Sequence, residues 1–365
     1  MYSNHILTKM ADEEPPASLP FMDESNPPSP SSITSAPPGN TVSERANHTE
    51  VERILNLPTF PEQVDAFAEL RGYFRPEPDS NSYASVTQYM AGSLSLSEAV
   101  NRIAEPIELA WTTGDHDPKF FKSESGKEPQ FSSTEGYLWD LWYSVLHTAK
   151  RTPWTDNAAH EKLLNLVKAL KERPDPERDS MLQGQDWAYD WVLGSDALWS
   201  NLLLLGPSSR ESQNDSPGCG AGFQVPEQQA FANVNSFWAR MTRDEVRGFW
   251  IYAIWALRGA LEEKYPEVEK WRWDAWVPTA AMWVLILREK LWDKEEDLTP
   301  KNEWEGNPAK PGSLWKEGKS EFSKKRWGFW KQRFGEVACD EGLAAETRRI
   351  AGMTAMVMED VERGR

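Results

Sequence analysis

Apolar residues recur at helical spacing along most of the chain after residue 50. The clearest case is the segment 137–151, and the segment 159–174 repeats the pattern. Spacings of three and four residues place apolar side chains on one side of an α-helix. Because Pro153 follows the first segment closely, we predict two helices joined by a short turn as an antiparallel hairpin. The two stripes consist of Leu138, Leu141, Trp142, Val145, Leu146 and Ala149, and of Leu163, Leu166, Val167 and Leu170.

The same spacing predicts helices on both sides of this hairpin. Ser95 and Glu98 form a capping box at the start of one helix, which Pro106 should end or kink. The segment 277–297 is apolar on more than one side and should lie at the centre of the fold. Further helices are predicted over 186–205 (one or two helices), 231–242, 245–263 and 322–362 (one helix or a pair).

Three segments lack this periodicity. Residues 1–45 are rich in proline, serine and acidic residues and predict a disordered tail, because such a composition buries too little apolar surface. The segment 206–228 predicts a long flexible loop, and 296–314 predicts a polar linker. No segment alternates like a strand and no repeat is sustained. We therefore predict an all-α protein, a multi-helix array of antiparallel helical hairpins around one tryptophan-rich core. Its predicted parts are the tail 1–45, a helical domain 50–295, the linker 296–314 and a C-terminal helix or helix pair 315–365 docked on that domain.

Composition and charge limit the classes of binding partner that we expect. Tryptophan occurs 19 times in 365 residues, which supplies much apolar area for such a core. The formal net charge of -17 makes nucleic acid and anionic lipid poor partners, so a protein partner is favoured.

Cysteine use and the N-terminal sequence indicate a compartment. Cys219 and Cys339 form neither a disulfide framework nor a zinc spacing, and we expect no metal and no cofactor. The first twenty residues lack an apolar signal core, and no apolar stretch is long enough to cross a membrane. We therefore expect an intracellular protein, cytoplasmic or nuclear.

Two segments carry a recognisable pattern of residues. The hairpin contains Leu138-Trp139, then Ala149-Lys150 before Pro153, and the segment 231–242 contains Asn233, Asn235, Phe237, Ala239 and Arg240. With these residues the chain resembles a fungal family known as domain of unknown function 3632, over roughly 85–295. The resemblance implies a fungal source and a helical fold, and it supplies no catalytic residues.

Acidic residues stand beside tryptophan at three positions. Asp140 follows Trp139, and Asp186 and Asp190 lie one helical turn apart next to Trp187 and Trp191. Carboxylates on indole platforms occur in glycosidases and in cation-binding pockets. Alternatively, the indoles fill the core while the acids face water.

Other polar positions are candidate ligand contacts. His147 lies beside the apolar stripe of its helix, and Asn235 and Arg240 interrupt an apolar helix pattern. If buried, such groups must be hydrogen-bonded, either to neighbouring helices or to a ligand. The Asp115-His116-Asp117 sequence and the glycine-rich 218–223 are weak metal and phosphate motifs, and we expect neither site. The candidate ligand-binding residues are thus Asp140, His147, Asp186, Asp190, Asn235 and Arg240.

One local segment is basic and aromatic. The segment 316–334 interleaves cations with aromatic residues, a composition that attaches some proteins to nucleic acid, membranes or partner proteins. Alternatively, its tryptophans dock into the core, which is the favoured interpretation. The candidate partner-binding residues are Lys324, Lys325, Arg326, Trp327 and Trp330.

No catalytic motif is recognisable, so the favoured hypothesis is a non-catalytic interaction or scaffold module. The alternatives are a small-molecule binder or enzyme with a tryptophan-lined pocket between helices, and attachment to nucleic acid or membrane through 316–334. The sequence leaves enzymatic activity undecided.

Overall fold

The computed structural model describes most of the chain, which divides into two units, Met1–Glu50 and Val51–Arg365. In the first unit the described residues belong to helix α2 (Val42–Leu55), which continues into the second unit. The tail predicted for 1–45 lies outside the described residues except at its end, where α2 has already begun. The described residues are 42–77, 79–113, 133–177, 197–217, 223–302, 304, 306–316 and 318–364.

The described part is almost wholly helical, which confirms the predicted all-α class. Two strands of two residues each, β1 (Glu296–Asp297) and β2 (Glu321–Phe322), pair antiparallel and were not predicted. Among the described residues no helix is long and apolar enough to cross a membrane. The α-helices of the second unit are α3 (Phe60–Arg71), α4 (Asn81–Ala91), α5 (Leu96–Thr113), α6 (Thr134–Arg151), α7 (Asn157–Lys171), α9 (Leu205–Gln213), α10 (Val225–Arg243), α11 (Trp250–Leu257), α12 (Trp271–Leu287), α13 (Glu289–Trp292), α14 (Lys324–Ala338) and α15 (Ala345–Glu362).

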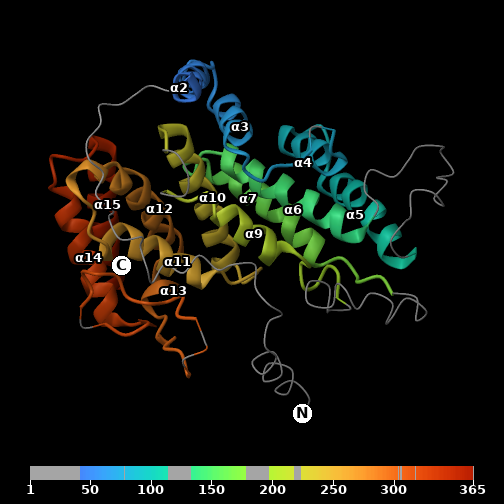
Figure 1. Ribbon diagram of the computed structural model, residues 1–365. Coiled ribbons are helices and arrows are strands. Elements are labelled where there is room, and N and C mark those ends of the chain that lie inside the picture. Colours follow the sequence, from blue (N-terminus) through green and yellow to red (C-terminus); the bar gives the residue numbers. More distant parts are fainter. Residues whose placement is uncertain are drawn as a thin grey trace, which may run out of the picture. The chain divides into compact units, whose positions relative to one another are not determined.

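Helix α10 connects two groups of helices within the second unit (Figure 1). On one side it contacts α3, α6 and α7, and α6 in turn packs against α4, α5 and α9. On the other side it contacts α11 and α12, and α12 packs against α15, which pairs with α14. Of the segment 277–297 predicted to lie at the centre, the part up to Leu287 does so in α12, whereas most of 288–297 is exposed or half-buried. The two helices of the predicted hairpin are α6 and α7.

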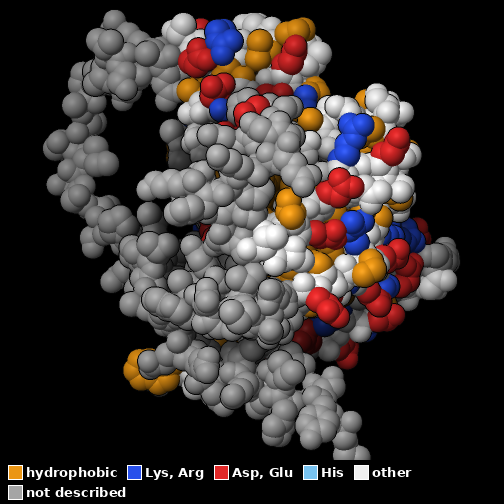
Figure 2. Space-filling model, turned by 90° about the vertical axis from the view of Figure 1, so that its right-hand side faces the viewer, with side chains coloured by type: hydrophobic (Ala, Val, Ile, Leu, Met, Phe, Trp, Pro, Cys, Tyr) orange, Lys and Arg blue, Asp and Glu red, His pale blue; other side chains and the backbone are white. Residues whose placement is uncertain are grey.

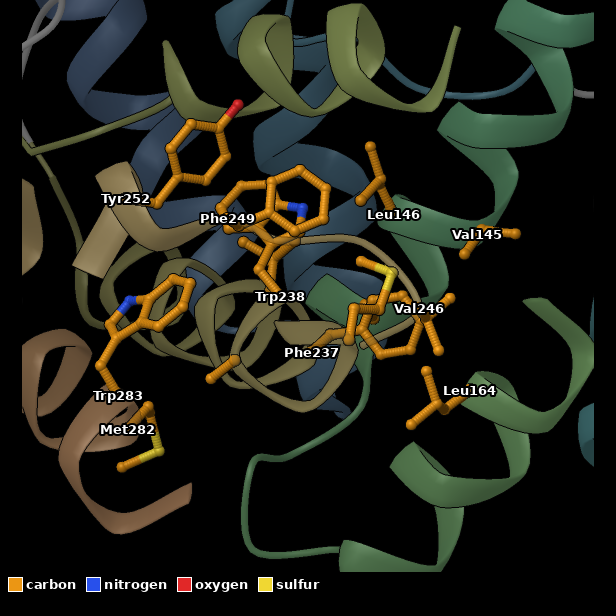
Figure 3. Packing of buried hydrophobic residues seen from close by; sticks show 14 of the residues in the cluster. Val145, Leu146, Leu164, Phe237, Trp238, Val246, Phe249, Tyr252, Met282 and Trp283 are labelled. Carbon is orange, nitrogen blue, oxygen red and sulfur yellow. The ribbon is translucent and has the colours of Figure 1, made fainter. Parts of the chain in front are cut away.

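The core between these helices is rich in tryptophan, as predicted. Trp238 packs edge-on against Tyr252 with ring centroids 5.1 Å apart, and Phe249 lies beside both rings (Figure 3). Each such ring removes roughly 150–250 Å² from water. The tryptophans with the least exposed side chains are Trp111, Trp142, Trp199, Trp238, Trp283, Trp327 and Trp330.

The start of α5 matches the predicted capping box, and its interior shows how a proline is accommodated. The Ser95 N–H donates to the Glu98 carboxylate at 2.9 Å, and the Glu98 N–H donates to the Ser95 hydroxyl at 3.2 Å. The helix does not end at Pro106, which cannot donate to the carbonyl of Arg102. That carbonyl accepts instead from the side-chain amide of Asn81 at 3.1 Å, so it stays hydrogen-bonded.

The prediction of helices over 186–205 is wrong where it can be compared with the structure. Only 197–205 is described, and it forms turns before α9 begins at Leu205. Leu202 and Leu204 have φ angles of +47° and +63°, in the left-handed region. An α-helix of L-residues cannot include that conformation, so the chain reverses there.

The predicted loop 206–228 is also partly wrong, because it contains α9 and the first turn of α10. Pro207 lies in the first turn of α9, where its missing N–H has no helical acceptor to lose. Most of the buried residues of α9 are serines, among them Ser208 and Ser212, so apolar periodicity gave no sign of it. Within the glycine-rich motif, 218–222 lies outside the described residues.

Two further boundaries differ from the prediction. The helix expected over 245–263 begins only at Trp250, because Glu245 is left-handed with a φ angle of +58°, and it ends in a π-helical turn, Arg258–Glu262. The segment expected as a polar linker contains β1 and the buried Ala309. It packs against the helices instead of merely connecting them.

Candidate functional site

An open cleft lies where the last turns of α10 and α12 meet the first turns of α7 and α13. Its volume is about 1010 Å³, including the part open to solvent. Four cations and two carboxylates line it, and each of the four cations pairs with a carboxylate of the lining or of its rim. We call it the basic cleft, and its lining residues are Asn157, Glu161, Arg240, Arg243, Leu285, Ile286, Leu287, Arg288, Glu289 and Lys290.

Arg240 forms the inner wall of the basic cleft, and only 3% of the residue is exposed. Its guanidinium donates to the Ser236 carbonyl at 3.1 Å and to the side-chain oxygen of Asn157. The Glu161 carboxylate lies 3.6 Å away. Burial lowers the pKa of Arg240 to about 10, which still leaves the group protonated at neutral pH. Arg240 is therefore a fixed positive charge at the back of the cleft.

Arg243 is held one turn further along α10. It donates to Asp244 at 2.6 Å and to Glu161 at 2.8 Å. Hydrogen bonds from Arg243 first, and then from Lys168, lower the pKa of Asp244 to about 2. This part of the cleft wall is a network of paired charges, which fixes the direction of the Arg243 side chain.

The opposite wall is less firmly held. Arg288 bonds Glu289 at 3.3 Å, and Lys290 bonds Glu245 at 2.7 Å, but the two carboxylate side chains are 58% and 82% exposed. Exposed ion pairs contribute only about 0–1 kcal/mol, so a ligand can replace these carboxylates at small cost.

Backbone strain also marks this wall. Arg288 joins α12 to α13 with a φ angle of +44° and a ψ angle of -115°, a region that residues with a side chain rarely occupy. Strained residues of this kind cluster at binding and catalytic sites.

On the face shown in Figure 2 the described acidic and basic side chains are interspersed. Three of the four cations that line the cleft are guanidinium groups. Guanidinium groups bind carboxylates and phosphates with two parallel hydrogen bonds. The cleft is thus suited chemically to binding an anionic group.

The candidate residues of α6 bind neighbouring helices instead of this cleft. Asp140 accepts from the hydroxyl of Ser80, the residue preceding α4, at 2.6 Å, and burial raises its pKa. His147 lies 2.8 Å from the carboxylate of Asp65 in α3, and burial lowers its pKa against the effect of that carboxylate.

The side chain of Asn235 in α10 also forms its hydrogen bonds within the protein. Asn235 accepts from the indole N–H of Trp283 at 3.0 Å and donates to the Phe231 carbonyl at 2.9 Å. The bond from Trp283 ties α10 to α12, whereas Phe231 belongs to α10 itself. Of the predicted candidates that the structure describes, only Arg240 lines the basic cleft, while Asp140, His147 and Asn235 have separate partners.

Some candidates cannot be placed. Asp186 and Asp190 lie outside the described residues, as do Asp115-His116-Asp117. Within the part of the chain that is described, no group of three or more histidine, cysteine or acidic side chains is arranged to hold a metal ion.

The basic and aromatic segment packs on the core. Trp327 and Trp330 are 2% and 1% exposed, and Arg326 is fully buried against Glu262. Lys324 lies over the ring of Trp292 at 3.7 Å, and Lys325 lies over that of Trp315 at 5.7 Å. Trp327 and Trp330 are therefore packed inside the protein, as the favoured interpretation expected, and attachment to nucleic acid or membrane through other residues of 316–334 stays a prediction.

Three cations of the basic cleft, Arg243, Arg288 and Lys290, were not among the predicted site residues. One signal in the sequence was available, since Arg240 and Arg243 are three residues apart and share a helix face. The cations of the other wall follow the long apolar α12, and only the fold brings the two walls together.

Comparison with known proteins identifies the family. The family model described as "Protein of unknown function (DUF3632)" matches residues 142–334, more than half of the chain, and this range includes the whole lining of the basic cleft. No curated protein and no solved structure matches the chain. The fungal source implied by the resemblance stays a prediction. The chain belongs to the family of proteins of unknown function DUF3632.

Proposed function

We propose that this protein is a non-catalytic interaction module that binds an acidic segment of a partner protein in the basic cleft. The observation that carries the proposal is the set of four cations from α10, α12 and α13 around one open depression. Arg240 and Arg243 are fixed by internal bonds, whereas the side chains of Arg288 and Lys290 are 40% and 45% exposed and pair with exposed carboxylates.

The shape of the cleft favours a peptide segment over a small molecule. A small-molecule site encloses most of its ligand, whereas this cleft is open along one side. Leu285 and Ile286 are only partly buried beside the cations. A chain that alternates acidic and apolar side chains would contact both kinds of lining group.

The overall negative charge does not forbid such a partner. At physiological ionic strength charges are screened over about 8 Å, so nearby cations decide the local potential. Binding should therefore weaken as salt is added, and it should depend on the cleft cations individually.

A direct test uses a fluorescein-labelled peptide of alternating glutamate and leucine, with its lysine–leucine counterpart as the comparison. Fluorescence anisotropy should show binding of the acidic peptide only. The double variant R288E/K290E should weaken that binding by about tenfold or more. The matched control is R349E/R363E, which reverses two exposed arginines of the C-terminal region that form local pairs on α15.

Two outcomes would refute the proposal. One is equal loss of affinity in the cleft variant and the α15 control, which would show a general charge effect. The other is no binding of the acidic peptide by the unmodified protein at low salt.

A further inference from the structure

A second, more enclosed hollow lies between α3, the end of α6 and the start of α10. Its volume is about 370 Å³ including its mouth, and its interior has room for about one water molecule. Most of its wall is apolar and is formed by phenylalanine and aliphatic side chains, including Phe67, Phe223 and Phe231. No tryptophan is among the residues that line this hollow.

Four polar residues line the same hollow, which we call the Lys150 pocket. They are Tyr73, Lys150, Asp215 and Glu227. Lys150 and Asp215 form an ion pair, although the residues are only 6% and 8% exposed. Removing such a pair from water costs free energy. Its presence in an apolar pocket is therefore not explained by a contribution to the stability of the fold.

The Glu227 carboxylate accepts its hydrogen bonds from donors of the protein itself. It accepts from the Arg71 guanidinium at 3.1 and 3.3 Å, from the Tyr73 hydroxyl at 3.2 Å and from the Gln224 N–H at 2.8 Å. With four donors on two oxygens it has little capacity left for a ligand. We therefore regard it as part of the wall.

The Lys150 ammonium has more N–H donors than it has hydrogen-bond acceptors among the described residues. An ammonium has three N–H donors, and among the described residues it bonds one carboxylate oxygen, that of Asp215. Its other contact is with the face of the Tyr73 ring, 5.8 Å from the centroid. A buried ammonium with donors to spare favours an additional hydrogen-bond acceptor inside the pocket.

The charges of the pocket indicate which acceptor fits. Lys150 and Arg71 are balanced by Asp215 and Glu227, so the pocket is already neutral. A second carboxylate at Lys150 would lie close to Asp215 and would add an uncompensated buried charge. An uncharged oxygen, as in a ketone, aldehyde or ester, accepts the hydrogen bond without that penalty.

We propose that the Lys150 pocket binds a small, uncharged carbonyl compound whose oxygen accepts a hydrogen bond from Lys150 and whose apolar part lies in the mouth against the phenylalanines. The site uses no residue of the basic cleft, so it stands independently of the proposed peptide binding.

The test compares ligands of one shape by NMR titration of the full chain. Acetophenone supplies the carbonyl, ethylbenzene lacks it, and benzoate adds a charge. Acetophenone should bind at least about tenfold more tightly than either, the ratio that one hydrogen bond from a charged donor provides. Equal affinities for acetophenone and ethylbenzene, or no binding of any of the three, would overturn the proposal.

Two variants test whether Lys150 is the hydrogen-bond donor to acetophenone. The double change K150M/D215N removes the donor and its partner together, so no unpaired carboxylate is left in the pocket. It should abolish the preference for acetophenone, whereas K331M should keep it, because Lys331 pairs with Glu362 elsewhere. A preference that survives in a folded K150M/D215N protein would exclude Lys150 as the donor.

Discussion

Arg326 places two guanidinium nitrogens against the carboxylate of Glu262, at 2.7 and 3.0 Å, with both side chains fully buried. The same carboxylate accepts from the indole of Trp330 at 2.7 Å and from the Gly312 N–H at 2.8 Å. One acidic side chain in the π-helical turn thus holds α14 and the segment before it. This explains why a basic and aromatic segment lies inside the protein.

Replacing Glu262 by glutamine should destabilise the fold by about 3 kcal/mol or more, because Arg326 would remain buried without a counter-charge. Chemical denaturation measures the change. The double variant E262L/R326M should cost less than E262Q, since it removes both charges. A cost below about 0.5 kcal/mol for E262Q would show that water reaches Arg326.

Replacing Arg288 by glycine should raise stability by about 0.5–1 kcal/mol, because glycine accommodates its positive φ angle, although glycine also gains entropy in the unfolded chain. The same change should weaken binding of the acidic peptide. Thermal unfolding and anisotropy measure the two effects. The control R349G, inside helix α15, should instead lower stability by about 1 kcal/mol. A loss of stability in R288G would contradict the assigned strain.

Replacing Asn233 by leucine should cost about 2–4 kcal/mol. Its amide donates to the Lys150 carbonyl at 2.9 Å and accepts from the Trp154 N–H at 2.7 Å, so both buried backbone groups would lose their partner. Urea unfolding measures the cost. The control N56L, at the exposed residue that follows α2, should change stability by less than about 0.5 kcal/mol.

Stability should fall as the pH drops from about 6.5 to about 4, through His160. Burial first, and then the nearby Arg240, lower the pKa of His160 to about 4, so the unfolded chain binds more protons in that range. The loss should reach about 3 kcal/mol for this group. Urea unfolding across the range should show a flatter pH dependence in H160N, and equal dependence in both proteins would refute the assignment.

Apolar periodicity sufficed to predict α6, α7 and α12, because each buries a continuous stripe or more of its surface. It failed at α9, whose buried residues are mostly serines. It also failed at Glu245 and Leu204, where the chain adopts left-handed backbone without glycine. These positions depend on contacts from distant segments, which a local pattern does not contain.

The residues of the two sites, like the helices, could be predicted from the sequence only in part. Arg240 could be singled out as a polar residue in an apolar helix, and it lies in the basic cleft. Its counterparts Arg288 and Lys290 follow α12, so only the packing of α10 against α12 reveals them. Lys150 belongs to a segment noticed for its resemblance to the family, but Asp215 and Tyr73 reach it from other parts of the chain.

Helix α10 has a consequence for how the two sites would communicate. Its 19 residues form one uninterrupted rod, about 28 Å long. The Lys150 pocket contains residues from its first turns, and the basic cleft contains residues from its last turn. An occupant that tilts this rod at one end must displace the other end. Thermodynamic reciprocity then requires that each ligand change the affinity of the other by the same factor, while a rod that stays in place would leave both affinities unchanged.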